Sequence, residues 1–405
     1  MHARLRDRTL EELYQRAVVA RAEFPALAPP YPKLPESLVT SGFERGTALN
    51  VDLFFEFLRT GVPPSPEDTA EVVQIALSRI RDGETLEEVL NRYSLGAELI
   101  WSRVRETAHG PERELLDDAA ISLLRYITLL TTRIATACVQ RAHDPRWELL
   151  ERRRAIADAL LTGRDPVEWA GEPAVAVPDA FLLAAFRLGS ARGGDTSELR
   201  HRIEAIPGVF LRLDSGGWTA LLPLHSGDDG TATLAALAAR LPGPGRLALG
   251  QTAQTEQPRS AAPAPFWVGV ATAVSRAAIP EVFAEARTLA ELGRCLGRPQ
   301  PVCRRADLMF EYTVAAGGSA RPGLAAVLEP LDSQTVLTET LDVFVDTGFN
   351  QLATARLLNV HRNTVTYRLA RVHELTGLDP HRPTDAMTLS AARIARRLET
   401  ACFAP

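Results

Sequence analysis

Gln351 to Leu369 read QLATARLLNVHRNTVTYRL, and this stretch decides the fold of the C-terminal region. Its apolar residues are spaced so that each of two short helices gains one apolar face. Ala355 provides a small residue where the helices cross, and Asn359 tolerates the left-handed conformation that the turn between them requires. The stretch therefore predicts a helix-turn-helix with the apolar residues Leu352, Ala355, Leu358, Val360, Val365 and Leu369.

The outer face of the second helix is polar. A helix that starts near His361 leaves hydrogen-bonding side chains without a core to face. Arginine pairs well with guanine in the major groove of DNA, and asparagine pairs well with adenine. We therefore interpret this helix as a recognition helix, with two amphipathic helices that only pack together as the alternative. The outward residues are His361, Arg362, Asn363, Thr366 and Tyr367.

Positive charge gathers in the same region. Four arginines and no acidic residue lie between Gln351 and Arg371, although the whole chain has a formal net charge of −5. Such a local excess predicts a face that contacts phosphates. We expect Arg362 and Asn363 to read bases, and the other arginines to contact phosphates or to support the fold. The candidate DNA-binding residues are Gln351, Arg356, His361, Arg362, Asn363, Thr364, Thr366, Tyr367, Arg368 and Arg371.

The run from Leu337 to Pro380 resembles the C-terminal DNA-binding domain of the PucR/CdaR group of bacterial transcriptional regulators. The specific part is HRNTV-x-YRL, from His361 to Leu369. The resemblance implies regulation of bacterial metabolic genes, with a double-stranded DNA operator as the partner.

Helix start and stop signals define an all-α domain over residues 331–405. Asp332 or Ser333 is expected to cap its first helix, which carries Leu337, Leu341, Phe344 and Val345 on one face. The other expected signals are an Asn350 cap on the next helix, Gly377 at the end of the recognition helix, and Thr384 as the cap of a last helix with Met387, Ala391, Ile394 and Leu398 on one face.

Residues 1–165 predict helices throughout and therefore an N-terminal helical bundle. Ser65-Pro66-Glu67-Asp68 has the features of a helix start, and Thr85 with Glu88 forms a capping box. Phe54, Phe55, Phe57 and Leu58 are interpreted as core, with a ligand pocket as the alternative. Arg152-Arg153-Arg154 is interpreted as a solvated helix face. The layout resembles the N-terminal domain of RsbR-type stress-response proteins, which implies a sensing or interaction role.

Residues 173–316 alternate strands and helices, and their order predicts an α+β, ferredoxin-like sheet with helices on one face. The strand FLLAAFRL precedes a helix from Asp195 to Ala205, and Asp214-Ser215-Gly216-Gly217 marks a hairpin. Phe266 to Ala271 predicts a further strand, and Ile279 to Leu296 predicts a helix. From Leu308 to Pro330, one helix and the connection GGSARPG are expected to lead into the C-terminal domain.

The middle region resembles a GGDEF-like domain, which is related to nucleotide cyclases. Here Gly216-Gly217 is followed by Trp218 and Thr219, and Arg187 stands where a metal-binding acid would be needed. Without paired carboxylates to hold magnesium ions, the charge of phosphoryl transfer has no stabilising group. We therefore expect a degenerate domain, no enzymatic activity, no cofactor and no bound metal, and disfavour a nucleotide cyclase.

The whole chain of 405 residues thus predicts a multidomain, mainly α regulator. Its four scattered cysteines, the lack of a signal peptide and the lack of a membrane-spanning segment indicate a cytoplasmic protein. We expect a homodimer or higher oligomer, because one short helix reads few base pairs. A small-molecule or protein effector is expected at the N-terminal domain. The alternative is a signalling scaffold whose helical bundle binds protein partners.

Overall fold

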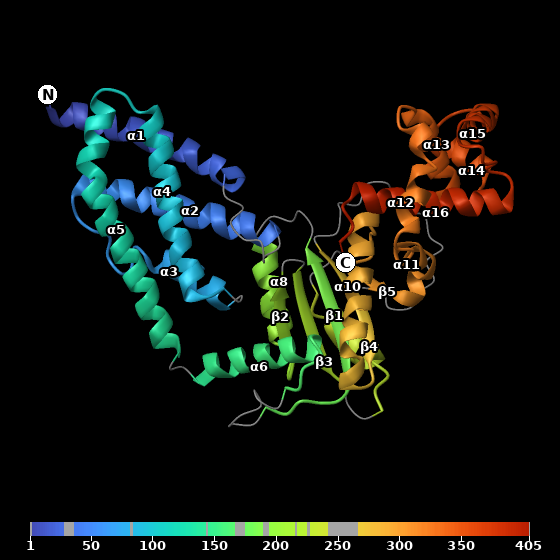
Figure 1. Cartoon of the computed structure of the whole chain (residues 1–405), viewed down its shortest axis with the longest axis horizontal. Coiled ribbons are helices and arrows are strands. Elements are labelled where there is room, and N and C mark those ends of the chain that lie inside the picture. The colour runs from blue at the N-terminus through green and yellow to red at the C-terminus, as the bar shows by residue number, and fades with distance from the viewer. Residues whose placement is uncertain are drawn as a thin grey trace. The chain divides into compact units, whose positions relative to one another are not determined.

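The computed structural model describes residues 2–27, 36–81, 84–142, 145–166, 175–188, 194–214, 217–224, 227–241 and 266–404 (Figure 1). The chain forms two compact units. One is built from Met1–Phe181, Ser190–Leu247 and Val274–Pro280, and the other from Leu182–Gly189, Ala248–Ala273 and Glu281–Pro405. The mainly helical composition and the mixed sheet of the described residues confirm the predicted fold class.

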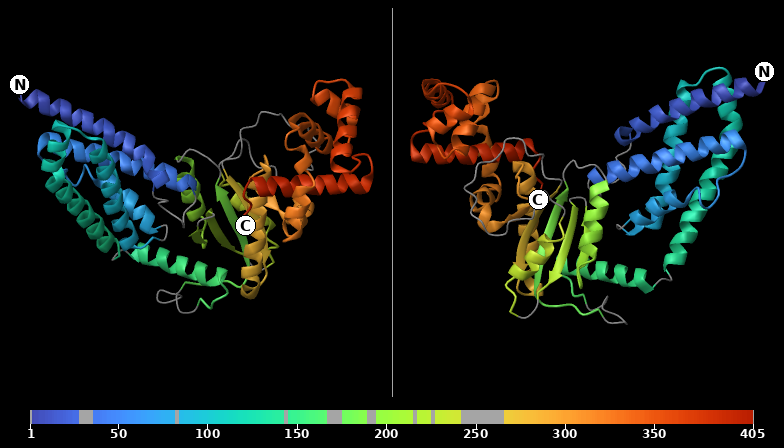
Figure 2. Two further views of the ribbon diagram at one scale, coloured as in Figure 1. Left: turned by 45° about the horizontal axis from the view of Figure 1, so that its top comes forward. Right: turned by 180° about the vertical axis from the view of Figure 1, so that it is seen from behind.

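Five helices pack into the predicted N-terminal bundle, and a sixth follows them (Figures 1 and 2). The capping box of Thr85 and Glu88 is present, with both reciprocal hydrogen bonds formed. Ser65 and Asp68 also exchange backbone-to-side-chain hydrogen bonds, of 2.7 and 3.2 Å, just before the third helix. The helices are α1 (His2–Leu27), α2 (Glu36–Thr60), α3 (Ala70–Arg81), α4 (Leu86–Thr107), α5 (Pro111–Ala142) and α6 (Pro145–Leu161).

The core of the bundle is rich in aromatic rings. Phe54, Phe55 and Phe57 are buried in this core and Leu58 is partly buried against it, and Phe54 and Phe55 also border a cavity. The rings of Tyr14 and Phe55 meet edge to face, with centroids 5.5 Å apart. This edge-to-face geometry is the one that aromatic pairs prefer, and it joins α1 to α2.

The middle of the chain forms one five-stranded sheet in the order β2-β3-β1-β4-β5. Along the chain, the first four strands and two of the helices follow the β-α-β-β-α-β order of the predicted ferredoxin-like region. The fifth was not predicted. It adds three residues parallel to β4 at the edge, where Val268 pairs with Val302. The strands are β1 (Phe181–Leu188), β2 (Phe210–Asp214), β3 (Gly217–Pro223), β4 (Phe266–Ala273) and β5 (Val302–Arg304).

The predicted hairpin is confirmed: β2 and β3 pair antiparallel, with Leu213 opposite Trp218. Its turn residues Ser215 and Gly216 lie outside the described residues. Helix α6 packs against β2, and Arg212 forms an ion pair of 3.3 Å with Asp158. The other helices of this region are α8 (Gly194–Glu204), α9 (Thr231–Ala238) and α10 (Ile279–Leu296), and α8 and α10 lie close to their predicted ranges.

Helix α10 lies very close to strand β4. A Cβ atom on Gly269 would lie 1.9 Å from the carbonyl oxygen of Ala286, so only glycine permits this approach. Trp267 of β4 and Leu289 of α10 share a core with Leu308 and with Leu398 near the C-terminus.

The C-terminal helices partly correct the sequence analysis. Within the expected connection GGSARPG, residues from Ala320 onward form a helix. Gln334, and not Asp332 or Ser333, precedes the first helix of the predicted domain, and Arg382, not Thr384, precedes the last. Of the predicted apolar face of that last helix, Leu398 is buried, Ala391 and Ile394 are partly buried, and Met387 is 63% exposed. The helices are α11 (Met309–Ala315), α12 (Ala320–Ala326), α13 (Thr335–Asp346), α14 (Gln351–Leu357), α15 (Arg362–Thr376) and α16 (Pro383–Thr400), and short 3-10 helices cover Arg276–Ala278, Arg305–Asp307 and Glu329–Leu331.

Candidate DNA-binding surface

The turn between α14 and α15 has the predicted geometry. Asn359 adopts a left-handed conformation with φ of 54°. Asn350 caps α14 by accepting hydrogen bonds from the backbone N–H groups of Leu352 and Ala353, at 3.0 and 3.1 Å. Gly377 ends α15 in the left-handed region, with φ of 73°. These local signals fix the ends of both helices.

A small core holds the two helices together. Ala355 of α14, Val365 and Leu369 of α15 and Phe344 of α13 are buried in one cluster, with Val360 partly buried against it. Leu352 was expected in this core but is 51% exposed. The buried residues of α14 (Gln351–Leu357) are instead Thr354 and Ala355.

The first turns of α15 present the polar side chains that were expected to face outward. Arg362, Asn363, Thr366 and Tyr367 are all exposed, and 72% of the surface of Tyr367 is accessible. Thr364 is half-buried. The exposed groups offer hydrogen-bond donors and acceptors on one helix end, as base recognition requires.

His361 has a structural role as well as an exposed position. Its Nδ1 accepts a hydrogen bond of 3.2 Å from the backbone N–H of Asn363, so the imidazole is the cap of α15. This bond requires Nδ1 to carry no proton, which leaves Nε2 as the atom available to a ligand.

Gln351 connects the start of α14 to the start of α15. Its Oε1 lies 3.5 Å from Nε of Arg362, and its Nε2 lies 2.5 Å from Nε2 of His381. Asp379 accepts a hydrogen bond from the backbone N–H of His381, which is the first cause of its lowered pKa. The sequence analysis missed His381, because it lies 30 residues from Gln351 along the chain.

The other arginines differ in their surroundings. Arg356 is exposed on α14. Arg368 is half-buried and lies 3.3 Å from Oγ1 of Thr340, so it supports the packing of α15 on α13. Arg371 is exposed and forms an ion pair with Glu374. The structure thus places Gln351 beside Arg362 at the exposed start of α15. Arg368 differs from them because its side chain is half-buried.

Comparisons with known proteins address both ends of the chain. The family described as "PucR C-terminal helix-turn-helix domain" matches residues 337–395. The C-terminal region contains a PucR-type helix-turn-helix domain. A second family, "RsbT co-antagonist protein rsbRD N-terminal domain", matches residues 11–154. Both matches support the resemblance of the chain to PucR/CdaR-type regulators, and the PucR-type domain contains every candidate DNA-binding residue.

Relatives match only part of the chain. An uncharacterized protein of Mycobacterium tuberculosis is 42% identical over 104 residues, which cover 25% of this chain and 25% of the relative. The carbohydrate diacid regulator of Escherichia coli is 41% identical over 73 residues, or 18% of each chain. The chain therefore spans a quarter or less of the length of these curated relatives.

One solved structure is also similar, the regulator of polyketide synthase expression from Bifidobacterium adolescentis. It is 21% identical, and the match covers 61% of this chain and 93% of that chain, with a TM-score of 0.27.

In the middle region, Arg187 lies on strand β1. It is buried and forms an ion pair of 3.3 Å with Glu291 of α10. Although burial alone would raise it, the pKa of Glu291 is lowered, because Arg294 and the backbone N–H of Ala404 donate hydrogen bonds to its carboxylate. This carboxylate thus connects the sheet, α10 and the C-terminal residues.

Trp218 is buried, with 1% of its surface exposed. It borders a cavity of about 60 Å³ that is also lined by Arg81, Arg153, Arg154 and Arg200. Arg153 and Arg154 are half-buried there, which corrects the expectation of a solvated helix face. No described protein group lies within hydrogen-bonding distance of the indole N–H of Trp218.

Within the described part of the chain, every helix is too short or too polar to cross a membrane.

Proposed function

We propose that this chain is a sequence-specific, DNA-binding transcriptional regulator of bacterial metabolic genes, and that it acts as a homodimer or higher oligomer in the cytoplasm. The observation that carries the proposal is the exposed, polar and basic start of α15 within a PucR-type helix-turn-helix domain. The name of the Escherichia coli relative, a carbohydrate diacid regulator, supports the same function.

Three regions would divide the work. Residues 331–405 bind the operator. Residues 173–316 form a degenerate GGDEF-like domain without catalytic activity, which dimerises or relays a signal. Residues 1–165 form a sensing or interaction bundle. The ion pair of Arg187 with Glu291 supports the absence of cyclase chemistry, since it uses the position of a metal-binding acid for structure.

A test of base reading starts with selection of bound sites from random DNA duplexes by the full chain. Arg362→Ala and Asn363→Ala should each weaken binding to the selected site by roughly 1–3 kcal/mol and relax the preference at one base position. Arg113→Ala and Asn91→Ala change exposed residues of α5 and α4 and are the matched controls. Unchanged affinity in both α15 variants would contradict the recognition-helix assignment.

Salt dependence tests the phosphate contacts. Arg356→Ala should weaken binding to all duplexes alike and reduce the slope of log affinity against log salt by about one unit. Arg371→Ala is expected to have the same effect on DNA binding. This substitution also removes the ion pair between Arg371 and Glu374. A variant that alters base preference and retains the wild-type slope would assign that arginine to base reading.

The RsbRD-type match supports a second candidate, a signalling scaffold whose bundle binds protein partners. The same experiment separates the two functions. A scaffold would show no selected DNA site, and any residual binding to DNA would be equal for wild type and the α15 variants.

A further inference from the structure

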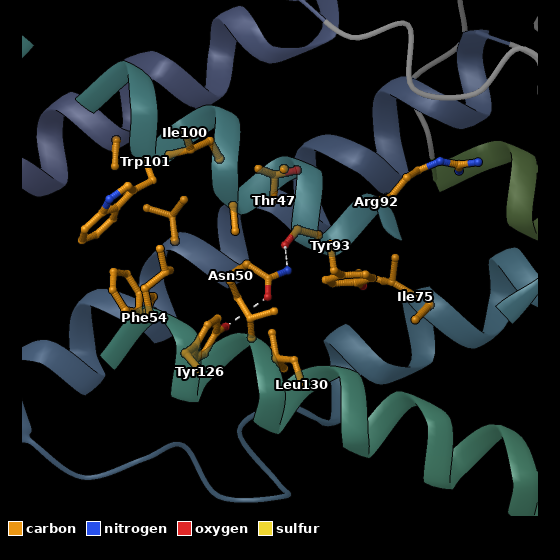
Figure 3. Close-up of a pocket in the computed structure, with 18 of the residues that line it drawn as sticks. Thr47, Asn50, Phe54, Ile75, Arg92, Tyr93, Ile100, Trp101, Tyr126 and Leu130 are labelled. Carbon is orange, nitrogen blue, oxygen red and sulfur yellow. Dashed lines mark hydrogen bonds between the residues drawn. The ribbon is translucent and has the colours of Figure 1, made fainter. Parts of the chain in front are cut away.

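The helices of the N-terminal bundle surround a cavity of about 140 Å³ (Figure 3). All five helices from α1 to α5 contribute lining residues. Protein interiors are close-packed and leave few voids larger than a water molecule. A cavity of this volume is therefore a departure from ordinary core packing.

The lining is largely aromatic and aliphatic. In Figure 3, Phe54 and Trp101 lie toward one end, and Tyr93 and Ile75 lie toward the other. Rings at both ends of the cavity favour a flat, apolar occupant, because aromatic rings stack or meet edge to face.

One polar pair lies between the two ends. The hydroxyl of Tyr126 donates a hydrogen bond of 3.0 Å to Oδ1 of Asn50, and Nδ2 of Asn50 donates one of 2.7 Å to the carbonyl oxygen of Gly46 (Figure 3). An amide nitrogen has two hydrogens and a hydroxyl oxygen also accepts, so the pair retains one donor and one acceptor. Burial raises the pKa of Tyr126, so its hydroxyl is neutral.

The charged residues at the cavity are arranged around one carboxylate. Both oxygens of Glu84 accept hydrogen bonds from Nη1 of Arg92, at 2.6 and 2.7 Å. Burial raises the pKa of Glu84, while Arg92 and then Arg79 lower it. Figure 3 shows the guanidinium of Arg92 pointing away from the aromatic rings. The space between the rings therefore suits a neutral molecule better than an ion, since an unpaired charge is costly to bury.

We propose that this cavity is the effector site of the regulator and that it binds one neutral aromatic molecule about the size of a single ring, with one hydrogen-bonding substituent, as in a phenol. An apolar cavity of about 150 Å³ is known to accommodate benzene. Stacking on Phe54 and Trp101 holds the ring, and the Asn50–Tyr126 pair bonds the substituent. The name effector for this ligand rests on the proposed regulatory function, whereas binding of the ligand in the cavity does not depend on that function.

The test is calorimetric titration of the full chain with phenol, benzene and benzoate. Phenol is expected to saturate one site per chain, and benzoate to bind at least tenfold more weakly. Ala97→Leu adds a side chain to the cavity lining and should abolish binding of phenol and benzene. Ala70→Leu, at an exposed position of α3, is the matched control and should bind as wild type does.

Tyr126→Phe removes one hydroxyl and keeps the ring, so it remains informative even if Ala97→Leu fails to fold. It should weaken phenol binding about fivefold, as expected for one lost hydrogen bond, and leave benzene binding within twofold. The proposal is overturned if wild type shows no saturable binding of phenol, if benzoate binds as tightly, or if a folded Ala97→Leu variant retains binding. DNA selection by a chain that binds no phenol would refute this site alone, whereas phenol binding without any DNA site would refute the regulatory function alone.

Discussion

At the scale of single residues, Trp218 shows how a hairpin position can serve packing. It follows the β2–β3 turn, for which the sequence analysis expected a degenerate site, and it is buried beside α6 and α8. Trp218→Ala should lower the free energy of unfolding by roughly 3–5 kcal/mol, because a large ring leaves a cavity. Trp218→Phe should cost much less, since it keeps most of the apolar surface and removes an N–H that has no described partner.

Thermal or urea unfolding of the full chain measures both variants. Their affinity for the selected DNA site at a temperature where they are folded should equal that of wild type. A Trp218→Ala variant with unchanged stability would contradict the packing role.

Glu291 predicts a pH dependence of stability. Its pKa in the folded chain is lowered from the ordinary value of 4.5, so its contribution to stability is complete above that value. The contribution is lost as the pH falls through the lowered pKa, because the unfolded state then binds the proton more readily. Glu291→Gln should reduce stability at neutral pH by roughly 1–3 kcal/mol, the worth of hydrogen bonds to a charged group.

When the pH is lowered from neutral to below the ordinary glutamate pKa of 4.5, the Glu291→Gln variant should lose less stability than wild type. Melting temperature measured across that range is the readout. Glu281→Gln, an exposed position in the first turn of α10, is the control and should keep the wild-type profile.

At the scale of elements, the turn between α14 and α15 depends on one left-handed residue. Asn359 has φ of 54°, a conformation that costs an alanine about 1 kcal/mol or more. Asn359→Ala should lower stability by about that amount, whereas Asn359→Gly should be close to neutral, because glycine adopts this conformation without strain. Chemical unfolding of the two variants side by side tests the prediction, and equal stability of both would contradict it.

Helix α15 also illustrates how one element divides its residues between packing and exposure. Val365, Leu369 and Val372 are buried along one face, whereas Arg362 and Asn363 are exposed at its start. Arg368 lies between these roles, because its contact with Thr340 attaches α15 to α13. A change at Arg368 is thus expected to alter stability together with DNA affinity.

At the scale of the whole molecule, we expect the chain to associate. A single recognition helix reads only a few base pairs, and two-fold pairing of helix-turn-helix domains spans two half-sites about one DNA turn apart. Sedimentation at the concentrations used for DNA binding should give at least twice the monomer mass of 44.1 kDa. A monomer mass both free and on DNA would contradict this expectation. The effects of the α15 variants on DNA affinity would then have to come from binding to one half-site.

The sequence by itself determined features that depend on a few neighbouring residues. The capping box of Thr85 and Glu88, the Asn350 cap, the left-handed Asn359 and the end of α15 at Gly377 are all set by local hydrogen bonds and backbone sterics. For the same reason, the exposed start of α15 could be predicted from helical periodicity. Whether those exposed side chains bind DNA stays a prediction.

Only the tertiary structure decided features that join distant parts of the chain. Strand β5 has three residues and forms because β4 offers a free edge, which no pattern in its own sequence indicates. Gln351 meets His381, and Arg187 meets Glu291 across 104 positions. The cavity in the bundle requires five helices to place their side chains around one space. Side-chain packing and burial choose these contacts, and neither can be read from spacing along the chain.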